Sequence, residues 1–195
     1  MDATTSRAQF LARGLKGGVG LVAAGSLLAV AEGTAFGATT ADADIAKLAA
    51  TAELLAIDFY GKAIASKRFR GDELDYMAAA LGNEQAHYRA LKGVLKAQTP
   101  HGLRFRYPDG VWASARSICK LGTALETAFV GAYMGAVTAL ESNELKGVAA
   151  EIGANESRHL SVLTNIARGR ITPAPALPKV LTAAQATKAL TPFLA

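Results

Sequence analysis

Four segments of about 26 residues each carry apolar side chains at intervals of three and four, and alanine and leucine dominate them. This spacing places the apolar residues on one face of an α-helix, and both residue types are strong helix formers. No segment carries a convincing strand pattern. We therefore expect an all-α protein with long helices over residues 42–67, 72–97, 111–140 and 143–168.

The links between these segments predict how the helices are arranged. Short polar stretches, SKRFRGD and ESN, join the first helix to the second and the third to the fourth, so each pair should form an antiparallel hairpin. The middle link, residues 98–110, holds two prolines. Fully extended it reaches roughly 43 Å, and a helix of about 26 residues is roughly 39 Å long. We therefore predict a four-helix bundle with one long crossover, in which the third helix starts parallel to the second.

The second and fourth predicted helices share the motif Asn-Glu-x-x-His. It reads Asn83-Glu84-x-x-His87 in one and Asn155-Glu156-x-x-His159 in the other. Residues three apart lie on one helical face, so the glutamate and the histidine of each motif can present an oxygen and a nitrogen to the same point. Each motif also has a matching upstream glutamate, because Glu53 precedes Glu84 by 31 residues and Glu126 precedes Glu156 by 30. The sequence thus predicts two hairpins of one design, related by a pseudo-twofold axis.

This pattern has a specific chemical use. A lone Glu-x-x-His is usually a solvated pair, but four carboxylates converging in an apolar core would repel one another, and two divalent ions would balance their charge. Imidazole with carboxylate suits iron or manganese, and zinc could replace them in vitro. We expect each Glu-x-x-His to serve mainly one metal, with Glu53 and Glu126 bridging or completing the pair and Glu84 and Glu156 most prone to shift or bridge. The predicted ligands of two metal ions, iron or manganese, are Glu53, Glu84, His87, Glu126, Glu156 and His159.

Two tyrosines lie two turns from the upstream glutamates on the same helical faces, namely Tyr60 and Tyr133. They are candidate catalytic residues with a redox role, or packing residues that hydrogen-bond a ligand carboxylate. Asn83 and Asn155 could support the ligands or simply lie at the helix surface. We expect Cys119 to be a small buried filler and His101 to be solvated.

Composition excludes some classes of function. The net charge of +5 comes from scattered lysines and arginines with no basic run, so we expect no nucleic-acid partner. The single cysteine rules out an internal disulfide. With 195 residues, of which 51% are hydrophobic, the chain can bury the core of one ordinary domain.

The N-terminal segment, residues 1–37, is typical of an export signal. A basic start is followed by an uncharged run over 17–31 and by small residues near 35–38, where a signal peptidase could cut. The run spans roughly 22 Å as a helix, short of the ~30 Å hydrocarbon core. SRAQFL resembles a twin-arginine motif, with Ala8 in place of the second arginine. We expect an exported protein, periplasmic or extracellular, and an uncleaved membrane-associated segment is the alternative.

The C-terminal segment, residues 169–195, follows the bundle domain of residues 42–168. RITPAPALP is a proline-rich tether. Thr182 and Gln185 then have the spacing of a capping box, which predicts one short helix to about Leu190. This helix could pack on the bundle or dock on a partner.

The ligand order Glu, Glu-x-x-His, Glu, Glu-x-x-His resembles the ferroxidase centre of bacterioferritins, in the ferritin-like superfamily. FRYPDGVW, LETAFVGAYMGAV and LTAAQATKALTPFLA resemble stretches of exported ferritin-like proteins, including the desiccation-related group. Bacterioferritins carry a haem-ligating methionine directly after the second-helix glutamate, and Gln85 stands there, so no haem is expected. The proline-rich tether and C-terminus differ from those of cage-forming ferritins, so we expect a monomer or dimer.

The resemblance implies a di-iron protein that oxidises Fe(II) with dioxygen or hydrogen peroxide. One alternative is a di-manganese, catalase-like enzyme. Another is a structural, stress-protective or membrane-associated bundle in which the metals only hold the helices together. All three need the same six ligands, so the sequence leaves the alternatives open.

Overall fold

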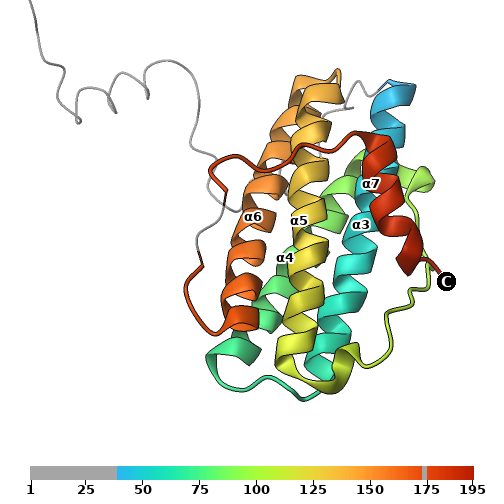
Figure 1. Ribbon diagram of the computed structural model, residues 1–195. Coiled ribbons are helices and arrows are strands. Elements are labelled where there is room, and N and C mark those ends of the chain that lie inside the picture. The colour runs from blue at the N-terminus through green and yellow to red at the C-terminus, as the bar shows by residue number, and fades with distance from the viewer. Residues whose placement is uncertain (1–38, 173–174) are drawn as a thin grey trace, which may run out of the picture. The chain divides into compact units, whose positions relative to one another are not determined.

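The computed structural model describes residues 39–172 and 175–195, and this part of the chain forms five α-helices and no β-strand. Four long helices make a bundle and a short fifth helix lies against it (Figure 1). The predicted all-α class, with its short C-terminal helix, is confirmed. The helices are α3 (Thr40–Ala65), α4 (Asp72–Leu95), α5 (Ala115–Ala139), α6 (Asn143–Arg168) and α7 (Ala183–Leu190).

The export signal predicted for residues 1–37 lies outside the described residues. Within the described part of the chain, none of the helices combines the length and the apolar character needed to span a membrane.

The chain follows the predicted one-crossover path. α3 and α4 pack as one antiparallel hairpin and α5 and α6 as another. Between the hairpins, the segment after α4 runs down the whole length of the bundle, so α5 starts at the same end as α4 and runs parallel to it (Figure 1). This topology brings the four helices side by side around one interior.

The start of α5 differs from the prediction, because Val111–Ala113 form a separate 3-10 turn. The Ser114 hydroxyl accepts a hydrogen bond from the Ser117 amide at 3.0 Å, and the Ser117 hydroxyl accepts one from the Ser114 amide at 3.1 Å. This capping box starts the α-helix at Ala115. The start predicted at Val111 was therefore wrong, because the apolar pattern continues across a change of helix type.

A buried carboxylate joins the two hairpins at one end of the bundle. Asp42, in the first turn of α3, has no exposed surface. Its side chain accepts hydrogen bonds from the amides of Glu141 at 2.7 Å and Ser142 at 3.1 Å, in the turn between α5 and α6. Asp42 therefore satisfies backbone donors next to the N-terminus of α6.

The part of the C-terminal segment around α7, residues 181–190, packs on the bundle, across α3 and α5 (Figure 1). The Leu181 amide donates to the Gly131 carbonyl at 2.9 Å. Glycine is required nearby, because a Cβ atom at Gly135 would lie 1.8 Å from the Leu181 carbonyl oxygen. The chain end then pairs with the crossover, where the Arg106 amide donates to Phe193 at 2.8 Å. Of the two placements left open for the C-terminal helix, packing on the bundle is the one observed.

The short helix α7 has the predicted bounds. The Thr182 hydroxyl accepts from the Gln185 amide at 3.3 Å, and the Gln185 side chain accepts from the Thr182 amide at 2.9 Å. The predicted capping box is confirmed, and the helix ends at Leu190.

Candidate metal centre

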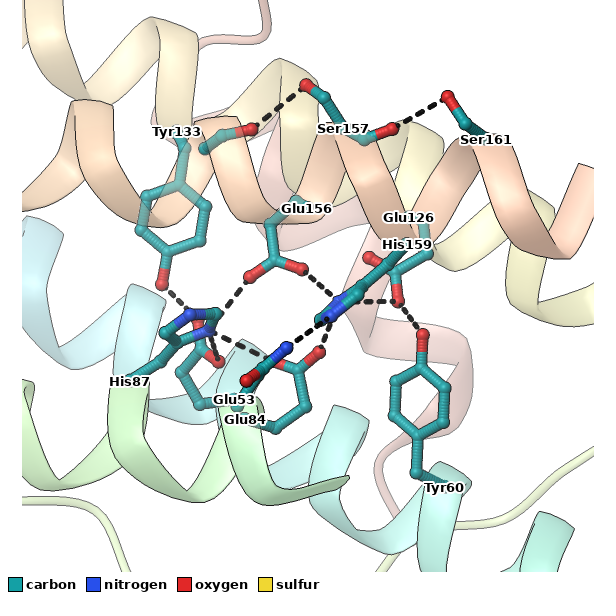
Figure 2. Close-up of polar contacts among 12 residues, drawn as sticks. Glu53, Tyr60, Glu84, His87, Glu126, Tyr133, Glu156, Ser157, His159 and Ser161 are labelled. Atoms are coloured by element: carbon teal, nitrogen blue, oxygen red, sulfur yellow. Dashed lines mark hydrogen bonds and ion pairs between the residues drawn. The ribbon is translucent and has the colours of Figure 1, made fainter. Parts of the chain in front are cut away.

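The six side chains predicted as ligands meet in the interior of the bundle (Figure 2). The helical spacing of the two Glu-x-x-His motifs turns each pair inward from α4 or α6, and α3 and α5 each contribute one glutamate. Five of the side chains are at most 2% exposed, and His87 is 9% exposed. The centre is therefore closed to bulk water, except for limited exposure at His87.

The first group of ligand atoms surrounds His87 Nδ1. Three carboxylate oxygens approach this nitrogen, from Glu156 at 3.0 Å, Glu84 at 3.2 Å and Glu53 at 3.3 Å. The oxygens come from three different helices. These four residues form one group able to hold a metal ion.

The second group surrounds His159 Nδ1 in the same way. Glu84 approaches it at 2.8 Å, Glu156 at 3.1 Å and Glu126 at 3.8 Å. These residues form a second group able to hold a metal ion. The pseudo-twofold relation predicted between the hairpins therefore extends to the positions of the side chains.

Glu84 and Glu156 belong to both groups. Each directs one oxygen to His87 and the other to His159 (Figure 2). Glu53 approaches only His87 and Glu126 only His159. Of the arrangements expected from the sequence, the structure has Glu84 and Glu156 between the two groups and Glu53 and Glu126 completing one group each. Each histidine therefore lies in one group and each glutamate of the two motifs lies in both, whereas the expectation that each Glu-x-x-His serves mainly one metal stays a prediction.

Hydrogen bonds among these six side chains cannot satisfy all of their carboxylate oxygens, whereas bound metal ions could. A histidine Nδ1 carries at most one hydrogen, which cannot serve three carboxylate oxygens at once. One carboxylate oxygen of each glutamate is buried without a hydrogen-bond partner, and buried acceptors of this kind are rare. Three of these oxygens lie near a histidine Nδ1 without a hydrogen bond to it, at 3.3 Å for Glu53, 2.8 Å for Glu84 and 3.0 Å for Glu156. The oxygens are Glu53 Oε2, Glu84 Oε1, Glu126 Oε2 and Glu156 Oε1.

Without metal, two of the glutamates favour the protonated form. Burial raises the pKa of Glu53 well above its usual value. Burial also raises the pKa of Glu126, and the negative charges of Glu156 and Glu84 add to the effect. Burial thus favours the neutral form of both carboxyls, and a proton on either of them lowers the repulsion inside the centre.

Glu84 and the histidines favour the charged forms. Burial opposes this, but the adjacent imidazole groups of His159 and His87 outweigh it and lower the pKa of Glu84 to about 2. Burial likewise disfavours the imidazolium forms, yet the surrounding carboxylates raise the pKa of His87 to about 12 and that of His159 to about 9. Protons thus occupy the positions that metal ions would take, and metal binding has to displace them.

Both candidate tyrosines contact a carboxylate of the opposite hairpin (Figure 2). The Tyr60 hydroxyl donates to Glu126 Oε1 at 2.5 Å, and the Tyr133 hydroxyl donates to Glu53 Oε1. Burial, together with the negative charge of these glutamates, raises the pKa of each tyrosine well above its usual value. The hydrogen bond to a candidate ligand, one of the two roles left open, is present. A redox role stays a prediction.

The two asparagines of the repeat differ. The side-chain nitrogen of Asn83 lies 3.2 Å from His159 Nε2, on the side of the ring away from the carboxylates, where such a contact fixes the ring orientation. In contrast, the Oδ1 atom of Asn155 is buried without a hydrogen-bond partner. The support predicted as one option for both asparagines is thus seen for Asn83.

Sequence reasoning missed Tyr76 on α4. Its ring lies edge-on to the ring of His159, with centroids 6.3 Å apart. Its hydroxyl is buried without a hydrogen-bond partner, and burial raises its pKa. The signal was available, because Tyr76 stands seven residues before Asn83 and so lies on the same helical face.

The other two residues behave as expected. Cys119 is fully buried in the main hydrophobic core, and burial, with a smaller contribution from Glu73, raises the pKa of its thiol to about 12. Cys119 is therefore a filler. His101 is exposed in the crossover.

The protein is a helical bundle whose interior is lined with carboxylate and imidazole groups that could hold metal ions. These features place it in the class of metal-binding helical bundles. Residues 41–168 match the family described as ferritin-like domain, and the chain belongs to this family. No curated protein matches the sequence.

Proposed function

We propose that this is a di-iron protein that oxidises Fe(II) with dioxygen or hydrogen peroxide. The observation that carries the proposal is the pair of buried groups around His87 and His159, which share Glu84 and Glu156. Carboxylate and imidazole donors suit iron, and the shared carboxylates would hold two ions next to each other.

The proposed reaction needs two electrons for each peroxide molecule. Two Fe(II) ions lose one electron each. Hydrogen peroxide takes up both electrons and two protons to give two water molecules, and dioxygen takes up two electrons and two protons to give hydrogen peroxide. When bound, the irons supply this redox chemistry, whereas the chain binds, orients and excludes water.

The side chains of the centre have separate tasks in this proposal. His87 and His159 each offer Nδ1 to one ion, and the glutamates complete the two groups. Tyr60 and Tyr133 hold Glu126 and Glu53 in place through their hydrogen bonds. Burial of all six ligands keeps water out, and the slight exposure at His87 marks the side nearest to solvent.

The first test is metal stoichiometry followed by turnover. We expect metal-free protein to bind two Fe(II) per chain under anaerobic conditions and to oxidise them when dioxygen or peroxide is added. Glu84→Gln should lose both properties, because Glu84 contributes to both groups. Glu151→Gln is the matched control, since Glu151 is an exposed residue of the same type on α6.

The same experiment separates the alternatives. Catalase-like function predicts manganese in natively purified protein and oxygen evolution from peroxide by the manganese form. Structural metals predict two bound ions with no turnover by either metal. Either result would replace the iron-oxidation proposal.

Export and a monomeric or dimeric state belong to the proposal as well. Cell fractionation and the mass of the mature N-terminus test export and cleavage of residues 1–37. Light scattering tests the assembly, and a stable particle of about two dozen chains would contradict it.

A further inference from the structure

A second feature of the bundle is a cleft beside the candidate centre. Its volume is about 220 Å³, and it lies between α3, α5 and the segment that contains α7. Small side chains of the long helices form its floor, and the C-terminal segment forms its outer wall. The floor includes Ala49, Ala52, Ala132, Ala136 and Ala139, and the wall includes Val180, Leu181, Ala186 and Leu190.

The cleft is held open by contacts that involve no ligand. Its outer wall is fixed to α5 by the hydrogen bond from Leu181 to Gly131, and the chain end is fixed to the crossover by the bond from Arg106 to Phe193. The alanine side chains of the floor are too short to fill the space that remains. The cleft is therefore preformed, as small-molecule sites usually are.

The size and shape of the cleft favour a narrow apolar ligand. An apolar cavity of about 150 Å³ binds benzene, so this cleft can hold a ligand of roughly eight to ten carbon atoms. Its lining on α5 runs from Ala128 to Ala139, a length of roughly 16 Å along the helix. An unbranched alkyl chain fits such a space better than a compact ring system.

The chemistry of the lining points the same way. Among the described residues, no charged side chain lines the cleft, and its hydroxyl groups are those of Thr138, Thr182 and Tyr133. The Tyr133 hydroxyl is already engaged with Glu53, and the Thr138 hydroxyl donates to the Gly135 carbonyl. Little polar capacity remains inside, so a polar head group has to stay outside.

The rim offers a place for a negatively charged head group. Val180 lines the cleft and yet is 53% exposed, so it marks the opening. The preceding residue, Lys179, is exposed and cationic, and nearby Leu177 is an exposed apolar residue of the same segment. An exposed cation next to apolar surface complements an anionic amphiphile.

We infer that this cleft binds a fatty acid, with the alkyl chain between α3, α5 and α7 and the carboxylate at the rim beside Lys179. The inference does not depend on the proposed iron chemistry, because the cleft is formed by other side chains, apart from Tyr133.

The test is calorimetric titration of the full-length, metal-free protein with decanoate below its micelle concentration. We expect saturable binding of one decanoate per chain. Ala132→Phe fills the floor and should weaken binding at least tenfold. Ala150→Phe, an exposed alanine on α6, is the matched control and should bind as the wild type does. Decanol and decyltrimethylammonium, with the same chain, should bind more weakly than decanoate.

Circular dichroism and the melting temperature show whether each variant folds. Ala139→Leu, at the end of the cleft, provides the same comparison if the bulkier Ala132→Phe does not fold. Absence of saturable decanoate binding, or equal affinity in the wild type and the folded cleft variant, overturns the inference. Equal affinity for decanol and decanoate overturns the carboxylate at the rim.

Discussion

The carboxylates of Glu84 and Glu156 differ from those of Glu53 and Glu126 in the number of candidate metal groups that they join. Each of the first two contributes an oxygen to both groups, whereas each of the others contributes to one. The consequences of substitution should therefore follow the number of groups that a residue joins, even though all four side chains are equally buried glutamates.

This difference can be measured by comparing Glu84→Gln with Glu53→Gln. Glu84→Gln should reduce bound Fe(II) from two ions per chain towards none, because both groups lose a charged donor. Glu53→Gln should leave one ion at the group around His159. Metal analysis after anaerobic loading gives the numbers, and the same stoichiometry in both variants would argue against shared ligands.

The sequence predicted the six residues of the candidate centre and named Glu84 and Glu156 as the glutamates most prone to bridge, but it left open whether Glu53 and Glu126 would bridge as well. The repeat of Glu-x-x-His is a local pattern, so it could be read from spacing alone. Which carboxylate lies between the groups depends on how α4 and α6 face each other, and this is a tertiary property. For the same reason, spacing placed Tyr60 on the face of Glu53, whereas its hydrogen bond goes to Glu126 in the other hairpin.

At the scale of the helices, the predicted bounds were accurate where a capping residue coincided with a break in the apolar pattern. The bounds of α6 and α7 agree with the prediction, because Ser142 and Thr182 are side-chain caps at clear breaks in the apolar pattern. α5 begins later than predicted, because its capping box lies within a continuous apolar stretch. The role of Asp42 could not be predicted, since its partners are 99 and 100 residues away.

Asp42 should be important for stability. Asp42→Ala removes a charged acceptor and leaves the amides of Glu141 and Ser142 without it. A hydrogen bond to a charged group contributes about 1.5–3 kcal/mol, so the loss of two such bonds should cost about 3–6 kcal/mol. Denaturant unfolding measures it. Asp44→Ala, at an exposed site in the same helix, should cost less than about 0.5 kcal/mol, and equal losses would contradict the prediction.

The contact between α5 and the C-terminal segment depends on Gly135. A methyl group there would overlap the Leu181 carbonyl, so Gly135→Ala should displace residues around Leu181. We expect faster proteolysis of the C-terminal segment with little loss of helix content. Gly147→Ala is the control, because a Cβ atom there meets nothing within 4 Å. Equal proteolysis in both variants would show that the segment is held elsewhere.

For the molecule as a whole, protonation and metal binding are linked. The pKa values of Glu53, Glu126 and the two histidines are all raised in the metal-free fold. Groups with raised pKa values bind more protons in the folded state, so their contribution to stability decreases as pH rises. The pKa of Glu84 is lowered to about 2, so its contribution to stability is lost as pH falls towards that value.

Metal should therefore stabilise the protein more at higher pH. Binding at a hundredfold excess over Kd adds about 2.7 kcal/mol, or roughly 5–10 °C in melting temperature for a protein of this size. We expect this gain from Mn(II) to be larger at about pH 8 than at about pH 6, since protons compete less for the ligands. Thermal unfolding with and without metal checks the prediction.

The double variant Glu53→Gln, Glu126→Gln controls for the origin of this effect. It should show a smaller gain from metal, while its metal-free form is at least as stable as that of the wild type. An unchanged melting temperature with metal, together with a less stable metal-free variant, would mean that the carboxylates serve other buried groups.

The sharing of carboxylates also defines how the chain could be divided. All six candidate ligands lie on α3 to α6, and the crossover contributes none of them. A cut in the crossover would leave two fragments, each with one histidine and only part of either coordination group. Neither fragment could complete a group alone, so both groups would form only when the two fragments reassemble.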